Sequence, residues 1–272
     1  MTDAVIIVLR EVLEAMLLIC MLMASSTAMG YRFRWMLPAL ALGACGATLY
    51  ALRLEQISLA FEGFGQEYVN STLLISIAIM LAAHNFLAVF QLRNLSGTVA
   101  YGPLVLVCIA TVGMAITREG AEIYLYGYSY GVLAGNVTSI FSGGAIGLGI
   151  GFSMGTFFYY GLRSLARRQR LIVCCAVSLV LGASMMGQAS VYLSQADILP
   201  YQEPLWDSSG LFEESSLMGE LLRAAIGYEA RPTLTQVSLY LGSVIVSTLA
   251  MLAGWRLRRA MESTKEGEAD AK

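Results

Sequence analysis

The sequence predicts an all-α, polytopic membrane protein with seven transmembrane helices, arranged as two inverted three-helix repeats plus a seventh helix. Composition is the first reason: of the 272 residues, 57% are hydrophobic and 13% are charged, whereas soluble domains carry about 25% charged residues. The second is the presence of seven apolar runs, each reaching the roughly 20 residues needed to cross a hydrocarbon layer. The third is a charged motif that occurs in both the first and the fourth run.

Short polar connections separate most of these runs. The predicted spans are 3–25, 36–54, 69–92, 101–127, 137–162, 171–195 and 233–256. We expect a single transmembrane domain over 1–256, in which repeat one covers 3–92 and repeat two covers 101–195. An outer loop, 196–232, precedes the seventh helix, and the charge-mixed tail, 257–272, is predicted to be disordered and cytoplasmic.

The elements of the two repeats correspond in order. After Asp3, the only charges of the first span are Arg10, Glu11 and Glu14, and the fourth span carries the same three charges again. The second and fifth contain small-residue stretches at 42–47 and 142–155, which allow helices to approach closely. The third and sixth qualify as spans by length and hydropathy.

The outer loop contains one candidate amphipathic helix, Ser216 to Ile226. Its apolar stripe consists of Leu217, Leu221, Leu222 and Ala225. Since a helix of this pattern lies flat in a membrane interface, we expect it at the membrane surface.

Basic residues predict the orientation. They occupy the connections after the first, third and fifth spans and the start of the tail: Arg32, Arg34, Arg93, Arg163, Arg167, Arg168, Arg170, Arg256, Arg258 and Arg259. The alternate connections hold an excess of acids or no charge, and 196–232 carries seven acids against two arginines. Because cytoplasmic loops are enriched in Lys and Arg, the N-terminus is predicted outside and the C-terminus inside.

The duplicated motif reads LREVLEAMLLI over 9–19 and TREGAEIYLYG over 117–127, an R-E-x-x-E sequence in each case. The copies lie in the first and fourth spans, with two spans between them, so the two helices run in opposite directions. At 1.5 Å per residue, both motifs then fall roughly 6 to 17 Å below the outer surface. We expect them to face one another.

The cost of burying charge indicates a function for this motif. Each charge near the centre of a membrane helix costs roughly 2.5 to 3.5 kcal/mol on insertion scales, so these side chains must face protein or water. Glutamates three residues apart share one helix face, and arrays of carboxylate oxygens suit hard cations. The candidate metal ligands are Glu11, Glu14, Glu119 and Glu122, with Arg10 and Arg118 in support.

A purely structural alternative is that Arg10 pairs with Glu14, and Arg118 with Glu122, as i,i+4 ion pairs that only lock two helices together. This alternative leaves Glu11 and Glu119 unpaired, and it does not explain the duplication. Ionisable residues inside membranes are functional by default, so we favour a cation site.

These residues resemble the oxidase-dependent, high-affinity iron permease family of fungi and bacteria, whose hallmark is an R-E-x-x-E motif in the first and fourth of seven transmembrane helices. The stretches QADILP (195–200) and LWDSSGLFEESSLMGELLRAAIGYEARPTLTQ (205–236) are similar to the outer loop of the bacterial branch. The resemblance covers nearly the whole chain.

The resemblance implies iron as the transported substrate, bound by the glutamates of both motifs, with no bound organic cofactor. It implies a redox partner outside the membrane, which is an oxidase, a peroxidase or a cupredoxin-like protein of the periplasm or exterior. It also implies a multi-pass cell-membrane location among lipids, in the inner membrane if the cell is Gram-negative.

Glu67, just before the third span, matches an acidic family position and is a candidate ligand at the outer mouth. Relatives with this motif also take up lead, so another divalent metal stays open; the oligomeric state is not specified.

Other residues have two interpretations each. His84, the only histidine, is a ligand, a proton relay or a core residue, and we favour the core. The methionines fit packing better than a Cu(I) path because they lack repeat-related spacing. Tyrosines at the end of a membrane span more often form an aromatic belt at the interface than bind Fe(III). We apply this interpretation to Tyr124, Tyr126, Tyr128 and Tyr130. The loop acids form either a solvated surface or a cation-gathering one: Asp197, Glu203, Asp207, Glu213, Glu214, Glu220 and Glu229.

The net charge and the absence of certain metal-binding motifs argue against several classes of function. A net charge of −2 gives no basic footprint for nucleic acid. An intramembrane di-iron enzyme would use Glu-x-x-His motifs, and no histidine follows either glutamate pair, so we do not expect an enzyme. The five cysteines lack C-x-x-C spacing, which argues against a thiolate metal site. A non-transporting metal sensor or scaffold subunit remains as an alternative to a permease.

Overall fold

The structure, a computed structural model, describes residues 2–91, 102–129, 137–214 and 216–270. Within these ranges the chain is helical and forms no strand. The helices are α1 (Thr2–Ala28), α2 (Met36–Leu52), α3 (Leu54–Leu59), α4 (Gly65–Gln91), α5 (Pro103–Tyr126), α6 (Val137–Ser164), α7 (Arg167–Gln195), α8 (Leu217–Ile226) and α9 (Leu234–Asp270), with short 3-10 turns at Phe33–Trp35 and Phe61–Gly63. Arg93 and Tyr130 lie outside the described residues.

Six helical segments are long and apolar enough to cross a membrane: Phe33–Leu52, Gly65–Phe90, Pro103–Ser129, Val137–Ser164, Arg167–Gln195 and Leu234–Met261. They coincide with six of the seven predicted spans, and by length and composition they describe a multi-pass membrane protein. The first predicted span also forms a helix, the 27-residue α1, which is not among the six.

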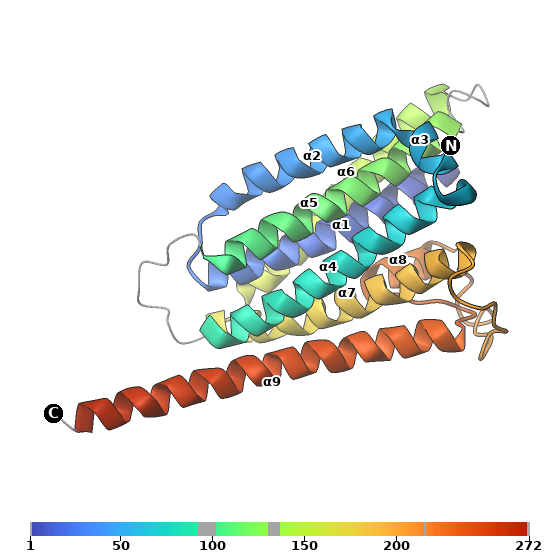
Figure 1. The fold of residues 1–272 in the computed structure, drawn as a ribbon. Helices are drawn as coiled ribbons and strands as arrows, with labels where there is room; N and C mark the ends of the chain where they lie inside the picture. The colour runs from blue at the N-terminus through green and yellow to red at the C-terminus, as the bar shows by residue number, and fades with distance from the viewer. Residues whose placement is uncertain (1, 92–101, 130–136, 215, 271–272) are drawn as a thin grey trace.

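The long helices form a bundle around a common direction (Figure 1). Helix α1 packs against α5, α6 and α7, and α4 packs against α5, α7 and α9. Helix α2 covers α5, and α6 covers α1. Helices α1, α4, α5 and α7 therefore make up the centre, and α2, α6 and α9 lie outside it.

Glycines determine how closely α6 lies on α1. A methyl group added at Gly147, Gly151 or Gly155 would meet the backbone or side chains of α1. At the equivalent contact of α2, a methyl group at Gly43 would meet Ile116 of α5. The predicted role of the two small-residue stretches, close helix approach, is confirmed. Such close packing supplies the dispersion contacts that hold helices together in lipid.

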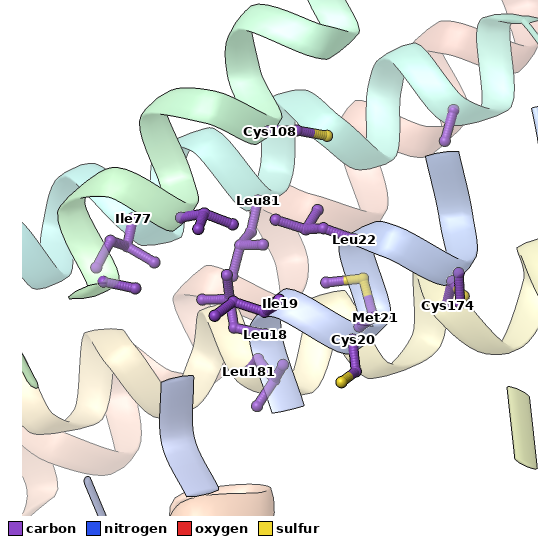
Figure 2. Close-up of a cluster of buried hydrophobic side chains, with 14 of the residues drawn as sticks. Leu18, Ile19, Cys20, Met21, Leu22, Ile77, Leu81, Cys108, Cys174 and Leu181 are labelled. Atoms are coloured by element: carbon purple, nitrogen blue, oxygen red, sulfur yellow. The ribbon is translucent and has the colours of Figure 1, made fainter. Parts of the chain in front are cut away.

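A layer of large apolar side chains fills the middle of the central bundle. Leu18 of α1, Leu81 of α4 and Leu181 of α7 come together there (Figure 2). Met21 and Ile77 belong to the same buried cluster. The middle of the bundle is therefore apolar.

The outer-loop helix α8, predicted to lie at the membrane surface, contacts the bundle through small residues. It packs against α1 and α7, with Gly219 and Ala224 buried, whereas Leu217 of the predicted stripe is exposed. The helix ends at Gly227, whose φ of 72° is accessible to glycine without strain, and this glycine packs against Ser184 of α7. Small residues, not the leucine stripe, face the bundle because they let α8 approach α7.

The tail also differs from its prediction. Helix α9 continues without a break to Asp270, across most of the segment predicted to be disordered. The residues of this extension are mostly Ala, Glu, Lys and Arg with no proline, and these are good helix formers when they continue an existing helix.

Candidate metal centre

The two R-E-x-x-E motifs meet in the bundle, as predicted. One copy lies on α1 and the other on α5, and these helices pack against each other. Glu11 is 0% exposed and Glu119 is 3% exposed. Groups so deeply buried and ionisable need partners, because an isolated charge in a low-dielectric interior is strongly disfavoured.

Arg118 joins the two copies. Its Nη1 donates to Glu119 Oε1 at 2.6 Å and to Glu14 Oε2 at 3.1 Å, and its Nη2 lies 2.9 Å from Glu122 Oε1. The i,i+4 pair of the structural alternative is therefore present, but the same guanidinium also binds the second glutamate of the other motif. One planar group holds three carboxylates from two helices.

Arg10 makes a looser, partly exposed set of contacts. Its Nε donates to Glu11 Oε1 at 2.8 Å, and its Nη2 contacts the same oxygen. Its guanidinium also lies 3.8 Å from Glu122 and 3.6 Å from Glu220 of α8. Glu220 was predicted only as one of several loop acids, so the structure adds a fifth carboxylate to the site.

Three of the four predicted ligands converge. Glu11, Glu119 and Glu122 each offer an oxygen within 4.8 Å of the others, and no other such group of three acidic, histidine or cysteine side chains is found over the described residues. The carboxyl groups of Glu11 and Glu119 lie within hydrogen-bonding reach of each other. The Oε2 atoms of both are buried without a hydrogen-bond partner. Two buried acceptors face each other here, an arrangement that a proton or a cation between them would stabilise.

Helix α7 supplies two neutral partners that sequence reasoning missed. Tyr192 Oη donates to Glu122 Oε1 at 2.9 Å, and Gln188 Nε2 donates to Glu14 Oε2 at 3.4 Å. Glu14 is thereby held between Gln188 and Arg118, and it is not one of the three converging ligands. The i,i+4 spacing of two polar groups in an apolar span was the signal that could have found them.

Glu67 lies in the first turn of α4, apart from the three converging ligands. Its Oε2 is buried without a partner, as are Tyr50 Oη and Asn70 Oδ1. Tyr50 interacts electrostatically with both Glu67 and Glu122. Tyr50 is therefore close enough to both the start of α4 and the carboxylate cluster to interact with each.

Most other candidates have structural roles. Met21 and Met185 are buried in the apolar core, as the packing interpretation predicts. Tyr124 and Tyr128 are exposed and stack at 6.2 Å, which fits an interfacial belt. All five cysteines are free.

Several outer-loop acids are engaged within the loop. Asp207 binds Arg231 at 2.9 Å, and Glu214 accepts a hydrogen bond from the backbone N–H of Ala230 at 2.7 Å. Hydrogen bonds from Ser209, and then Arg231, lower the pKa of Asp207 to about 2. A lowered pKa means that the contact persists above the ordinary pKa and is lost as pH falls through about 2. Burial raises the pKa of Glu229.

Comparisons with protein-family models, with curated proteins and with solved structures find no match for this chain.

Proposed function

We propose that this chain is an iron permease that moves iron across the cytoplasmic membrane through the carboxylates of its two R-E-x-x-E motifs. The observation that carries the proposal is the convergence of Glu11, Glu119 and Glu122 from two helices. Oxygen-only ligands suit hard cations, and the motif's resemblance to iron permeases selects iron among these.

The proposal includes seven spans, with α1 as the first. Helix α1 is as long as the six apolar helices and is enclosed by α5, α6 and α7. The charged residues of its R-E-x-x-E motif have partners in the bundle, and Glu11 and Glu14 are buried. The two ends of the chain lie at opposite ends of the bundle (Figure 1), which an odd number of crossings requires. Together with the arginine distribution, this supports the N-terminus outside and the C-terminus inside.

Helix pairing supports two inverted repeats. The first helix of each repeat packs against the second helix of the other, as α1 with α6 and α5 with α2. The third helices, α4 and α7, pack against each other. Gly43 and Gly151 lie 108 positions apart, the same offset as Arg10 and Arg118, and each packs against the first helix of the opposite repeat. A pseudo-two-fold axis in the membrane plane would produce this exchange.

In this proposal the cation lies between the carboxyl groups of Glu11 and Glu119. There it binds the oxygens that have no hydrogen-bond donor. Arg118 and Arg10 balance the carboxylate charge before the cation arrives, and Tyr192 and Gln188 hold two of the carboxylates in orientation. Because guanidiniums and cation compete for the same oxygens, binding stays reversible. A transport site needs such reversibility, since an ion that binds too tightly cannot leave.

Glu67 and Tyr50 provide the outer approach in the proposed path, and Glu220 contributes a carboxylate from the loop side. Iron would reach this mouth through a redox partner on the outer face, which is an oxidase, a peroxidase or a cupredoxin-like protein. That part rests on the resemblance to the family and on the outward position of the acidic loop.

Two alternatives have specific support. Oxygen ligands accept other divalent metals, so a permease for a metal such as lead fits the same cluster. The continuous apolar layer below the cluster favours a sensor or scaffold subunit that binds metal without moving it. Radioactive iron uptake into proteoliposomes separates these functions: a permease accumulates iron inside, a sensor binds without accumulation, and a lead permease takes up lead in preference to iron.

A further inference from the structure

A second group of buried polar side chains lies on the other side of the apolar layer. It consists of Ser25 on α1, His84 and Asn85 on α4, and Ser247 on α9. His84 Nε2 lies 2.9 Å from Ser25 Oγ, and Asn85 Nδ2 donates to Ser247 Oγ at 2.9 Å. Three helices are thus joined by polar contacts within the membrane interior.

Two atoms of this group, His84 Nδ1 and Asn85 Oδ1, are buried without a hydrogen bond of ordinary geometry. The two side chains lie within hydrogen-bonding reach of each other, so a proton on Nδ1 would be shared with Asn85. With its proton on Nε2, the imidazole donates to Ser25 and leaves a lone pair on Nδ1. The Asn85 amide donates one of its two N–H groups to Ser247, and its oxygen presents lone pairs. In this tautomer an electron-pair donor from nitrogen and one from oxygen lie side by side in a buried site.

This group shares its helix faces with the carboxylate cluster. The buried face of α1 carries Glu11, Glu14, Leu18, Met21 and Ser25 at spacings of three and four. The buried face of α4 carries Asn70, Leu74, Ile77, Leu81 and His84 at the same spacings. Each face is polar at both ends and apolar between. From Glu14 to Ser25 the axial distance is about 16 Å at 1.5 Å per residue.

We propose that His84 and Asn85 form a second, inner binding station for a divalent transition metal. The inference rests on the proposed permease function for the direction of movement. An ion that leaves the carboxylates must cross the apolar layer, and a charge without ligands there is strongly disfavoured. Imidazole nitrogen binds divalent iron, manganese, cobalt and zinc well, whereas hard ions such as Ca²⁺ prefer oxygen. The inner station therefore favours divalent transition metals over hard cations such as Ca²⁺. The outer carboxylates do not make this distinction.

The test uses Mn²⁺ and pulsed electron paramagnetic resonance on the full chain, purified through a tag that contains no histidine. Because the chain has one histidine, any imidazole nitrogen coupling to Mn²⁺ comes from His84. We expect this coupling in the wild type, and we expect it to persist in a Glu11→Gln/Glu119→Gln variant that lacks the outer ligands. His84→Leu should lose the coupling together with one bound Mn²⁺. Asn85→Leu should keep the coupling but bind Mn²⁺ several-fold more weakly.

Absence of imidazole coupling in the wild type at saturating Mn²⁺ would overturn the proposal and return His84 to a structural role. Coupling that persists in His84→Leu would overturn it as well. The wild-type spectrum decides the question even if a variant does not fold. The spectroscopy does not depend on uptake: iron uptake without imidazole coupling refutes the inner station alone, and coupling without uptake refutes the permease alone.

Discussion

Arg118 Nη1 lies 3.1 Å from Glu14 Oε2, and this contact connects the second R-E-x-x-E motif to the first. The same nitrogen donates to Glu119 of its own motif at 2.6 Å. An arginine that served only an i,i+4 pair within one helix would not reach across to α1. The contact makes the two motifs one site. Both arginines contact three carboxylates, but Arg118 is buried and its contacts are all at 3.1 Å or less, whereas Arg10 is partly exposed.

Arg118→Lys should lower iron uptake by about tenfold or more, because an ammonium cannot hold three carboxylates as a planar guanidinium does. Arg10→Lys should have a smaller effect, since Arg10 is partly exposed and two of its three carboxylate contacts are at 3.6 and 3.8 Å. Initial uptake rates in proteoliposomes, at equal protein content, give the comparison. Equal, full activity of both variants would mean that the arginines supply charge alone.

Gly151→Val should weaken the packing of α6 on α1, since even a methyl group at this position would meet Val12. Overpacking of this kind costs about 1–3 kcal/mol, so the thermal unfolding midpoint in detergent should fall. Gly149→Val is the matched control, because nothing lies within 4 Å of a methyl group there. Equal midpoints for the two variants would show that this helix contact does not stabilise the bundle.

The orientation can be tested by cysteine labelling. Glu203 and Gln169 are both exposed, and they lie in the outer loop and at the start of α7. A membrane-impermeant thiol reagent should label Glu203→Cys in intact cells and should label Gln169→Cys only after permeabilisation. A Cys45→Ala background removes the one exposed native cysteine. The opposite labelling pattern would reverse the topology.

The outer-loop acids that make no ion pair within the described part of the chain should affect how often iron reaches the protein. They should not affect the translocation step. Glu203 and Glu213 are exposed, whereas Asp207 and Glu214 are engaged in the loop. Neutralising Glu203 and Glu213 should raise the iron concentration for half-maximal uptake and leave the maximal rate unchanged. Added salt should mimic this effect in the wild type, because charges are screened over about 8 Å at physiological ionic strength. A loss of maximal rate would instead put one of these acids in the permeation path.

Patterns that are local in the sequence predicted much of this protein. Hydropathy located the long helices, and the repeated charges located Glu11 and Glu119, because a buried charge stands out in an apolar run. The contributions of Gln188, Tyr192 and Glu220 were not predictable in this way, since a polar residue becomes a partner only when another helix brings a charge beside it. The contacts of α8 with the bundle were not predictable from its leucine stripe, because its buried face is made of glycine and alanine, which hydropathy patterns do not register.

The most direct test of the central claim is radioactive iron uptake into proteoliposomes that contain Glu119→Gln, Glu11→Gln or wild-type protein. Glutamine keeps the shape of glutamate but removes the charge that a cation requires. We predict time-dependent accumulation in the wild type and a loss of at least about tenfold in each variant, at equal protein content and with unchanged elution on size exclusion. Accumulation at the wild-type rate in both variants would contradict the claim that these carboxylates form the iron site.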